Sequence, residues 1–79
     1  MIISAEISYY PLSDDYTTPI DHFIQALSKS NIKVETGKMS TTLTGDYNEI
    51  MELVTESMDA LMQKYPSIFN IRISNACPV

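Results

Sequence analysis

Hydrogen-bonding side chains recur at alternate positions near the start of this sequence, where they could bind a small polar ligand. Between residues 2 and 10, apolar residues alternate with polar ones, among them Glu6, Ser8 and Tyr10. Successive side chains of a β-strand point to opposite faces, so these three are expected to share one face of a sheet. Further hydroxyl groups follow at Ser40, Thr41 and Thr42. Carboxylates accept hydrogen bonds and attract cations, and hydroxyls both donate and accept, so these side chains could hydrogen-bond a small polar molecule.

The residue types that carry catalysis or bind metals do not form a pattern of their own. His22 has no second His or Cys to complete a metal site and is predicted to lie on the surface. Cys77, the single cysteine, lacks a Cys or His at ligand spacing and cannot form an internal disulfide. The sequence contains neither a glycine-rich phosphate loop nor a nucleophile paired with a base. We therefore expect that the protein is not an enzyme and that it binds no metal and no cofactor.

Composition restricts the partners and the compartment. Ten acidic residues against five Lys and Arg give a net charge of −5, which repels nucleic acids and anionic membranes. No apolar run is long enough to span a membrane, and the first residues lack the basic region of a secretory signal. Together with the single cysteine, these features predict a cytoplasmic protein without nucleic-acid or membrane partners.

Periodicity predicts the elements that position these side chains. Pro11 ends the first strand, and Thr18 is predicted to cap a helix that has Pro19 at its first position and stops near Asn31. Strands are expected at residues 32–37, 39–44 and 69–74, with a hairpin turn at Gly37-Lys38 in which Gly37 takes a positive φ. Asp46 is expected to cap a second helix, which Tyr65-Pro66 closes.

Amphipathic patterns indicate how the elements pack. The expected apolar stripes are Ile20, Phe23, Ile24 and Leu27 in the first helix and Ile50, Leu53, Val54, Ser57 and Leu61 in the second. The acids Glu49, Glu52, Glu56 and Asp59 are expected to form a solvated face. The order βαββαβ predicts one domain over residues 1–79 of the α+β class, a ferredoxin-like sandwich with two helices on one face of a four-stranded antiparallel sheet. In a core this small, the free energy gained by burying apolar surface barely exceeds the conformational entropy lost on folding. Oligomerisation, which buries more surface, is therefore expected.

Two stretches resemble a known family, the small thiamine-binding proteins of the YkoF-like type. The first is Ala5-Glu6-Ile7-Ser8-Tyr9-Tyr10-Pro11-Leu12. The second runs from Gly37 to Met51 and contains Gly37-Lys38-Met39-Ser40-Thr41 and Gly45-Asp46-Tyr47-Asn48-Glu49-Ile50-Met51. They correspond to an A-E-I-S-x-Y-P-L opening and a G-x-M-x-T-x-x-x-G-x-[WY]-x-E-[IV]-M segment, and the resemblance extends over nearly the whole chain.

The resemblance implies a ferredoxin-like domain that binds thiamine or its hydroxymethylpyrimidine moiety without transforming it, as a homodimer or homotetramer. The family's motif residues fall here on Glu6, Ser8, Tyr10, Met39 and Thr41, with Gly45 making the turn into the second helix. The sequence departs from the family pattern at Lys38, Ser40, Thr44 and residues 75–79. Ser40 and Thr44 lie beside the motif, so the exact ligand stays open.

Two alternatives remain at this stage. Glu6 lies in a predicted central strand, where a buried carboxylate needs a partner. That partner is either Arg72 on the adjacent strand or the aminopyrimidine or cationic thiazolium of a ligand, and the two are compatible if the ligand rearranges the pair. The alternative to a ligand-binding protein is an oligomerisation or regulatory module whose open sheet face meets only another chain.

Overall fold

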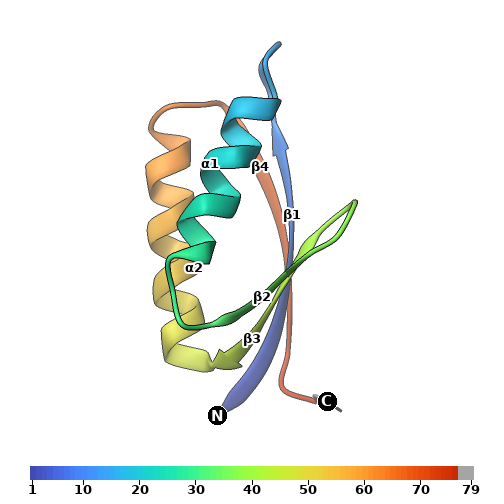
Figure 1. Cartoon of the computed structure of the whole chain (residues 1–79), viewed down its shortest axis with the longest axis vertical. Helices are drawn as coiled ribbons and strands as arrows, with labels where there is room; N and C mark the ends of the chain where they lie inside the picture. The colour runs from blue at the N-terminus through green and yellow to red at the C-terminus, as the bar shows by residue number, and fades with distance from the viewer. Residues whose placement is uncertain (77–79) are drawn as a thin grey trace.

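The computed structural model describes residues 1–76 and contains six elements in the order βαββαβ (Figure 1). They are β1 (Ile2–Pro11), α1 (Thr17–Ser28), β2 (Lys33–Thr36), β3 (Thr41–Asp46), α2 (Tyr47–Met62) and β4 (Ser67–Ser74). Within this range no helix is long and apolar enough to cross a membrane. The predictions for Cys77 fall outside the described residues.

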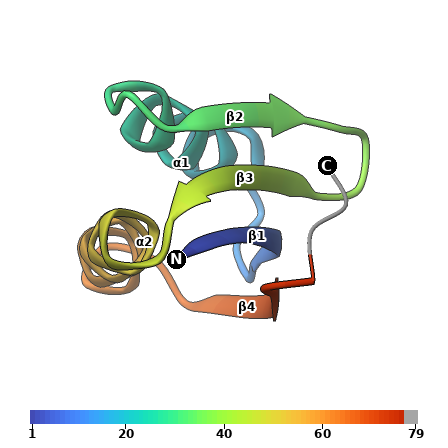
Figure 2. The same cartoon turned by 90° about the horizontal axis from the view of Figure 1, so that it is seen from below.

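The four strands form one antiparallel sheet in the order β2-β3-β1-β4. Both helices cover the same face of that sheet, which leaves the other face open (Figures 1 and 2). The first and third strands therefore lie in the centre, and the fourth strand pairs with the first. This arrangement confirms the predicted ferredoxin-like fold.

The core lies between the sheet and the helices and follows the predicted periodicities. In β1 the alternate residues Ile3, Ala5 and Ile7 are each 1% exposed. The buried helix residues are Pro19, Phe23 and Leu27 of α1 and Ile50, Val54, Ser57 and Leu61 of α2. The remaining predicted stripe residues, Ile20, Ile24 and Leu53, are only partly buried. The predicted acidic face of α2 is exposed at all four positions, Glu49, Glu52, Glu56 and Asp59.

The boundaries of α1 differ from the prediction. The helix begins at Thr17, and its N-cap is Tyr16 instead of Thr18, with no capping hydrogen bond from the Tyr16 side chain. The carboxylate of Asp15, the residue before Tyr16, bonds to the first turn. Its Oδ2 accepts a hydrogen bond from Thr18 Oγ1 at 2.7 Å and its Oδ1 accepts one from Thr18 N at 3.3 Å. These bonds, that of the Thr18 side chain foremost, lower the pKa of Asp15. The helix ends at Ser28, before Asn31, and Ser30 Oγ donates to Leu27 O at 2.9 Å.

The second helix begins where the sequence predicted. Asp46 is its N-cap, and its side chain accepts hydrogen bonds from Asn48 N at 3.1 Å and Glu49 N at 3.3 Å. Glu49 also places a negative charge in the first turn, where the helix dipole favours it. Gly45, which the resemblance placed at the turn, is the penultimate residue of β3 and lies opposite Ile3.

The β2–β3 hairpin was predicted with too short a turn. β3 begins at Thr41, so the loop runs over four residues, and Gly37 N donates to Ser40 O across it at 2.8 Å. The prediction that Gly37 has a positive φ is wrong, since its φ lies outside the left-handed region. Glycine is favoured by a close approach instead, because a Cβ at this position would lie 3.2 Å from Ser40 O. The longer loop leaves Met39 84% exposed at the hairpin.

β4 is longer than predicted and begins at Ser67, where it pairs with Pro11. β1 likewise continues through Pro11 instead of stopping before it. Proline is tolerated at this end because the β1–β3 pairing ends at Ile7 and Thr41, so no strand on that side requires an amide donor from Pro11.

Candidate functional site

The open face of the sheet brings together most of the polar residues singled out in the sequence. Glu6 lies opposite Thr42 of β3 and Arg72 of β4. Ser8 and Tyr10 follow it along β1 on the same face, because the intervening residues of β1 point toward the helices. The predicted shared face of Glu6, Ser8 and Tyr10 is therefore present, and the backbone register adds Thr42 and Arg72 to it.

Glu6 contacts two neighbours. Its Oε2 accepts a hydrogen bond from Ser40 Oγ at 3.1 Å, and its Oε1 lies 3.5 Å from Arg72 Nη1. The ion pair with Arg72, one of the two predicted uses of Glu6, is thus formed. It is solvent-exposed, with side-chain exposures of 44% for Glu6 and 81% for Arg72, and exposed pairs contribute about 0–1 kcal/mol. The chain by itself therefore does not bury this carboxylate.

A cavity of about 350 Å³ adjoins this cluster on the sheet. It is lined by Ser4, Ala5, Glu6, Thr42, Arg72, Ile73 and Ser74. The volume lies within the range of small-molecule sites, and the lining combines a carboxylate, a guanidinium and several hydroxyls. Such a surface can accept hydrogen bonds from an amino group and exchange hydrogen bonds with ring nitrogens.

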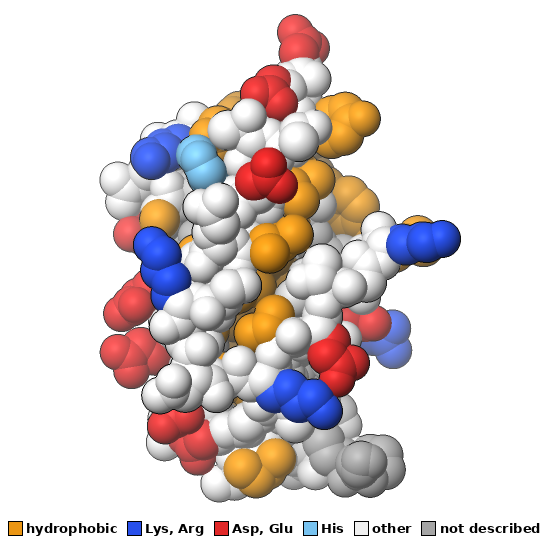
Figure 3. Space-filling model, viewed as in Figure 1, with side chains coloured by type: hydrophobic (Ala, Val, Ile, Leu, Met, Phe, Trp, Pro, Cys, Tyr) orange, Lys and Arg blue, Asp and Glu red, His pale blue; other side chains and the backbone are white. Residues whose placement is uncertain are grey.

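The remaining predicted site residues lie at the β2–β3 hairpin. Thr41 pairs with Ile7 and is 5% exposed, so its side chain faces the helices, whereas Thr42 faces the open side. Met39, Ser40 and Thr41 border a smaller cavity of about 100 Å³ between the hairpin and α1. Hydrophobic side chains follow the gap between α1 and the hairpin in Figure 3. Ser40 links the two places, because it borders this cavity and donates to Glu6.

Tyr9 is a packing residue next to the smaller cavity. Its ring stacks on Phe69 with centroids 4.5 Å apart and meets Phe23 edge-on at 5.3 Å. Its hydroxyl shares a 3.0 Å hydrogen bond with Ser67 Oγ. Of the tyrosines near the predicted site, Tyr10 is the one that remains 50% exposed on the open face.

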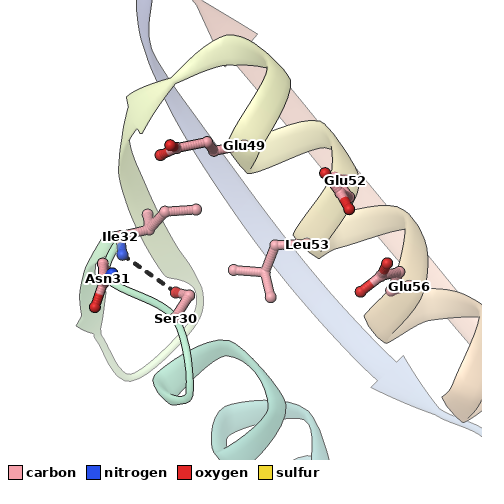
Figure 4. A pocket seen from close by; sticks show the side chains of 7 residues that line it. All are labelled: Ser30, Asn31, Ile32, Glu49, Glu52, Leu53 and Glu56. Carbon is pink, nitrogen blue, oxygen red and sulfur yellow. Dashed lines mark hydrogen bonds between the residues drawn. The ribbon is translucent and has the colours of Figure 1, made fainter.

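Sequence reasoning missed a hollow between α2 and the loop that follows α1. Glu49, Glu52 and Glu56 lie along one side of it, and Ile32 and Leu53 form its apolar part (Figure 4). Its volume is about 240 Å³. These three acids are three and four residues apart, a spacing that places them on one side of a helix. The sequence therefore contained a signal for this acidic side of the hollow. These carboxylates are not arranged to bind a metal ion together. Among residues 1–76, no cluster of three or more His, Cys, Asp or Glu side chains could hold one.

Solved structures with the same fold come from several organisms. A Streptococcus pneumoniae protein superposes with a TM-score of 0.92 at 21% identity, over 99% of this chain and 90% of that one. A candidate thiamine biosynthesis or salvage protein of Thermotoga maritima superposes with a TM-score of 0.86 at 27% identity, covering 94% and 83% of the two chains. A Bacillus cereus domain of unknown function gives a TM-score of 0.81 at 23% identity, covering 94% and 75%.

No curated protein sequence matches the chain. The family model described as thiamine-binding protein matches residues 5–76. This range includes both helices, three whole strands, β1 from its fourth residue onward, and Glu6, Ser40, Thr42 and Arg72. The resemblance noted from the two sequence motifs is thereby confirmed over nearly the whole length. The chain belongs to the thiamine-binding protein family.

Proposed function

We propose that this protein binds thiamine or its hydroxymethylpyrimidine moiety on the open face of the sheet, without transforming it. The observation that carries the proposal is the position of Glu6 in the central strand, hydrogen-bonded to Ser40 and beside a 350 Å³ cavity that Thr42 also lines. Membership of a family named for thiamine binding supports it. With a net charge of −5, which disfavours nucleic-acid and anionic-membrane partners, the protein would work in the cytoplasm as a carrier or sensor.

In this proposal the chemistry of the ligand matches that of the site. An aminopyrimidine would donate its amino hydrogens to Glu6, and the hydroxyl of Thr42 would donate to a ring nitrogen. Ser40, whose hydroxyl hydrogen is already donated to Glu6, would hold that carboxylate in position. Arg72 can move away from Glu6 at little cost, because its side chain is 81% exposed and its ion pair is long at 3.5 Å. Ser8 and Tyr10 extend the surface along β1, while Met39 and Thr41 stay as predicted site residues at the hairpin.

The charge of the site predicts a preference among thiamine derivatives. Glu6 and the net charge of −5 favour a neutral or cationic ligand and disfavour the anionic pyrophosphate ester. In calorimetric titrations at moderate salt, thiamine and hydroxymethylpyrimidine should bind more tightly than thiamine pyrophosphate. The pyrophosphate should also displace bound thiamine poorly. Efficient displacement by the pyrophosphate would contradict a site that depends on Glu6.

The alternative is an oligomerisation module, and one observation favours it. Tyr10 and Ile68 lie directly opposite each other on the open face and are 50% and 51% exposed. Adjacent exposed apolar side chains on an uncovered sheet are typical of a surface that meets another chain. The two functions are compatible if the open faces of two copies meet around the ligand cavity, as a homodimer or as part of a homotetramer.

The oligomer can be tested at that pair. Light scattering of the wild-type protein at micromolar concentration should report at least a dimer. Ile68→Lys places a charge on the open face and should shift the population toward monomer. Met62→Lys is the matched control, because Met62 is similarly exposed at 53% but lies at the end of α2, so it should leave the mass unchanged. A folded wild-type monomer at this concentration would exclude the oligomer.

A further inference from the structure

The helical layer contains a buried hydroxyl without a partner. Ser57 belongs to the buried side of α2 and is 4% exposed. Among residues 1–76, its Oγ is the only buried side-chain nitrogen or oxygen that has no hydrogen-bond partner. A helical serine commonly donates to the carbonyl four residues earlier, as Ser28 does to Ile24 O at 2.8 Å. Ser57 does not make that bond, so its hydroxyl is available to another acceptor.

Ser57 is one of the residues that line a cavity of about 290 Å³ between the two helices. One wall comes from His22 and Gln25 of α1 and from Lys29, its C-cap, and the other comes from Ser57 of α2 and from Lys64, two residues beyond that helix. Within each wall the residues recur at spacings of three, four or seven, which places them on one side of each helix. The space exists because the other residues that line it include the small Ala26 and Ala60.

The charge of this groove is opposite to that of the whole protein. The chain carries −5 overall, yet the lining contains two of its five Lys and Arg residues, its single histidine and no acid. Neither Lys29 nor Lys64 forms an ion pair within the described part of the chain, whereas Lys33 and Arg72 both do. In Figure 3, basic side chains and the histidine lie over the α1–α2 side of the molecule, with acidic side chains further out along the same edge.

The polar groups are spread along the groove. His22 Nδ1 lies 3.2 Å from Tyr65 OH, which orients the imidazole and leaves its Nε2 for another partner. Lys64 is the residue before Tyr65, so it lies at the His22 end. Lys29 follows His22 by seven residues, about 10 Å further along the helix axis. Ser57 precedes Lys64 by the same seven residues on a helix that runs the opposite way (Figure 1), so it lies toward the Lys29 end of the groove. Every charged group in the lining is basic.

We propose that the α1–α2 groove is a second ligand site, separate from the open sheet face, which binds the phosphate group of a small organic phosphate. Ser57 Oγ donates to a phosphate oxygen, Lys29 and Lys64 neutralise the charge, and Gln25 and His22 contact the rest of the molecule. The cavity is larger than a phosphate group needs, which favours an ester over the free ion.

Glycerol 3-phosphate, inorganic phosphate and uncharged glycerol are suitable probes, with amide chemical shifts and calorimetry as readouts. Glycerol 3-phosphate should shift the amides of Gln25, Ser57 and Ala60, while glycerol should not. Lys29→Gln and Lys64→Gln should each weaken binding at least 5-fold. Lys38→Gln is the matched control, because it removes the same charge from an exposed residue of the hairpin, and it should bind like wild type.

Ser57→Ala separates a binding role from a structural one. It should weaken glycerol 3-phosphate binding while leaving the melting temperature equal or higher, because it removes an unpaired buried hydroxyl. Inorganic phosphate should bind more weakly than glycerol 3-phosphate. Equal affinities for the two would overturn the preference for an ester, because the groove would then bind the free ion as well. The proposal is overturned if no amide of the groove shifts at millimolar glycerol 3-phosphate. Equal weakening by Lys38→Gln and Lys64→Gln would overturn it as well.

Discussion

Replacing Glu6 by glutamine is expected to weaken thiamine binding by about 1.5–3 kcal/mol, roughly 10- to 150-fold in Kd. Glutamine keeps the shape of the side chain but removes the charge and exchanges one acceptor oxygen for a donor. An amino group of the ligand would then lose a charge-assisted hydrogen bond. The Ser40 contact can survive, because the remaining amide oxygen still accepts. Calorimetric titration of the variant with thiamine measures the effect.

Glu35→Gln is the matched control for this experiment. Glu35 lies opposite Thr42 from the β2 side and pairs with Lys33 at 3.2 Å, but it does not line the cavity. Its replacement changes the net charge by the same amount and should leave Kd within about 2-fold, since exposed pairs contribute about 0–1 kcal/mol. Equal effects of the two variants would mean that overall charge, and not a contact with Glu6, controls binding.

The melting temperature and mass of Glu6→Gln distinguish the two roles of this residue. If Glu6 contacts the ligand, both should stay close to wild type, because its pair with Arg72 is exposed. If the carboxylate serves only Arg72 in an assembled oligomer, the variant should melt earlier or dissociate. Its folded fraction would then bind thiamine normally. That result would remove Glu6 from the site and favour the oligomerisation module.

Leu43→Ala is expected to lower the free energy of unfolding by about 2–5 kcal/mol, the range for truncating a buried leucine. Leu43 is 0% exposed in β3 and lies between Ala5 of β1 and Val34 of β2. A chain of this length has a total stability of only about 4–12 kcal/mol, so much of it would be lost. Because Leu43 is the residue after Thr42, the open-face site should lose its order together with the core. Urea denaturation monitored by circular dichroism gives the difference.

Leu12→Ala provides the comparison, since it removes the same atoms from a side chain that is 58% exposed. Its backbone amide can still donate to Pro66 O, so the change should cost less than about 0.5 kcal/mol. Similar losses in the two variants would contradict the central position of β3 in the core.

The sequence by itself determined the order of the elements and the buried side of β1, β4 and both helices. Ile3, Ala5 and Ile7 alternate with polar residues, and period-two alternation is a local property of a half-buried strand. The same reasoning assigned Glu6 to the face away from the helices. The cap at Asp46 was also predictable, because its acceptor reaches amide groups only two and three residues away.

Loop length was not predictable at the β2–β3 hairpin, and the orientation of the hydroxyls depended on it. Sequence alternation alone did not distinguish Thr41 from Thr42 as the residue on the open face. A shift of one residue reverses every side chain of a strand, so the four-residue loop and the pairing of Thr41 with Ile7 decide the matter. The structure therefore assigns Thr42 to the face of Glu6 and Thr41 to the helices.

Contacts between distant parts of the chain were decided only by the tertiary structure. Ser40 and Arg72 reach Glu6 across 34 and 66 residues. The lining of the α1–α2 groove comes from two helices that are separated in the sequence by the β2–β3 hairpin. Ser57 illustrates the difference, because its spacing predicts a buried position in the α2 stripe but not the absence of a partner. Periodicity records which side of an element meets the core, whereas packing of the elements sets which polar groups face one another and how much space remains between them.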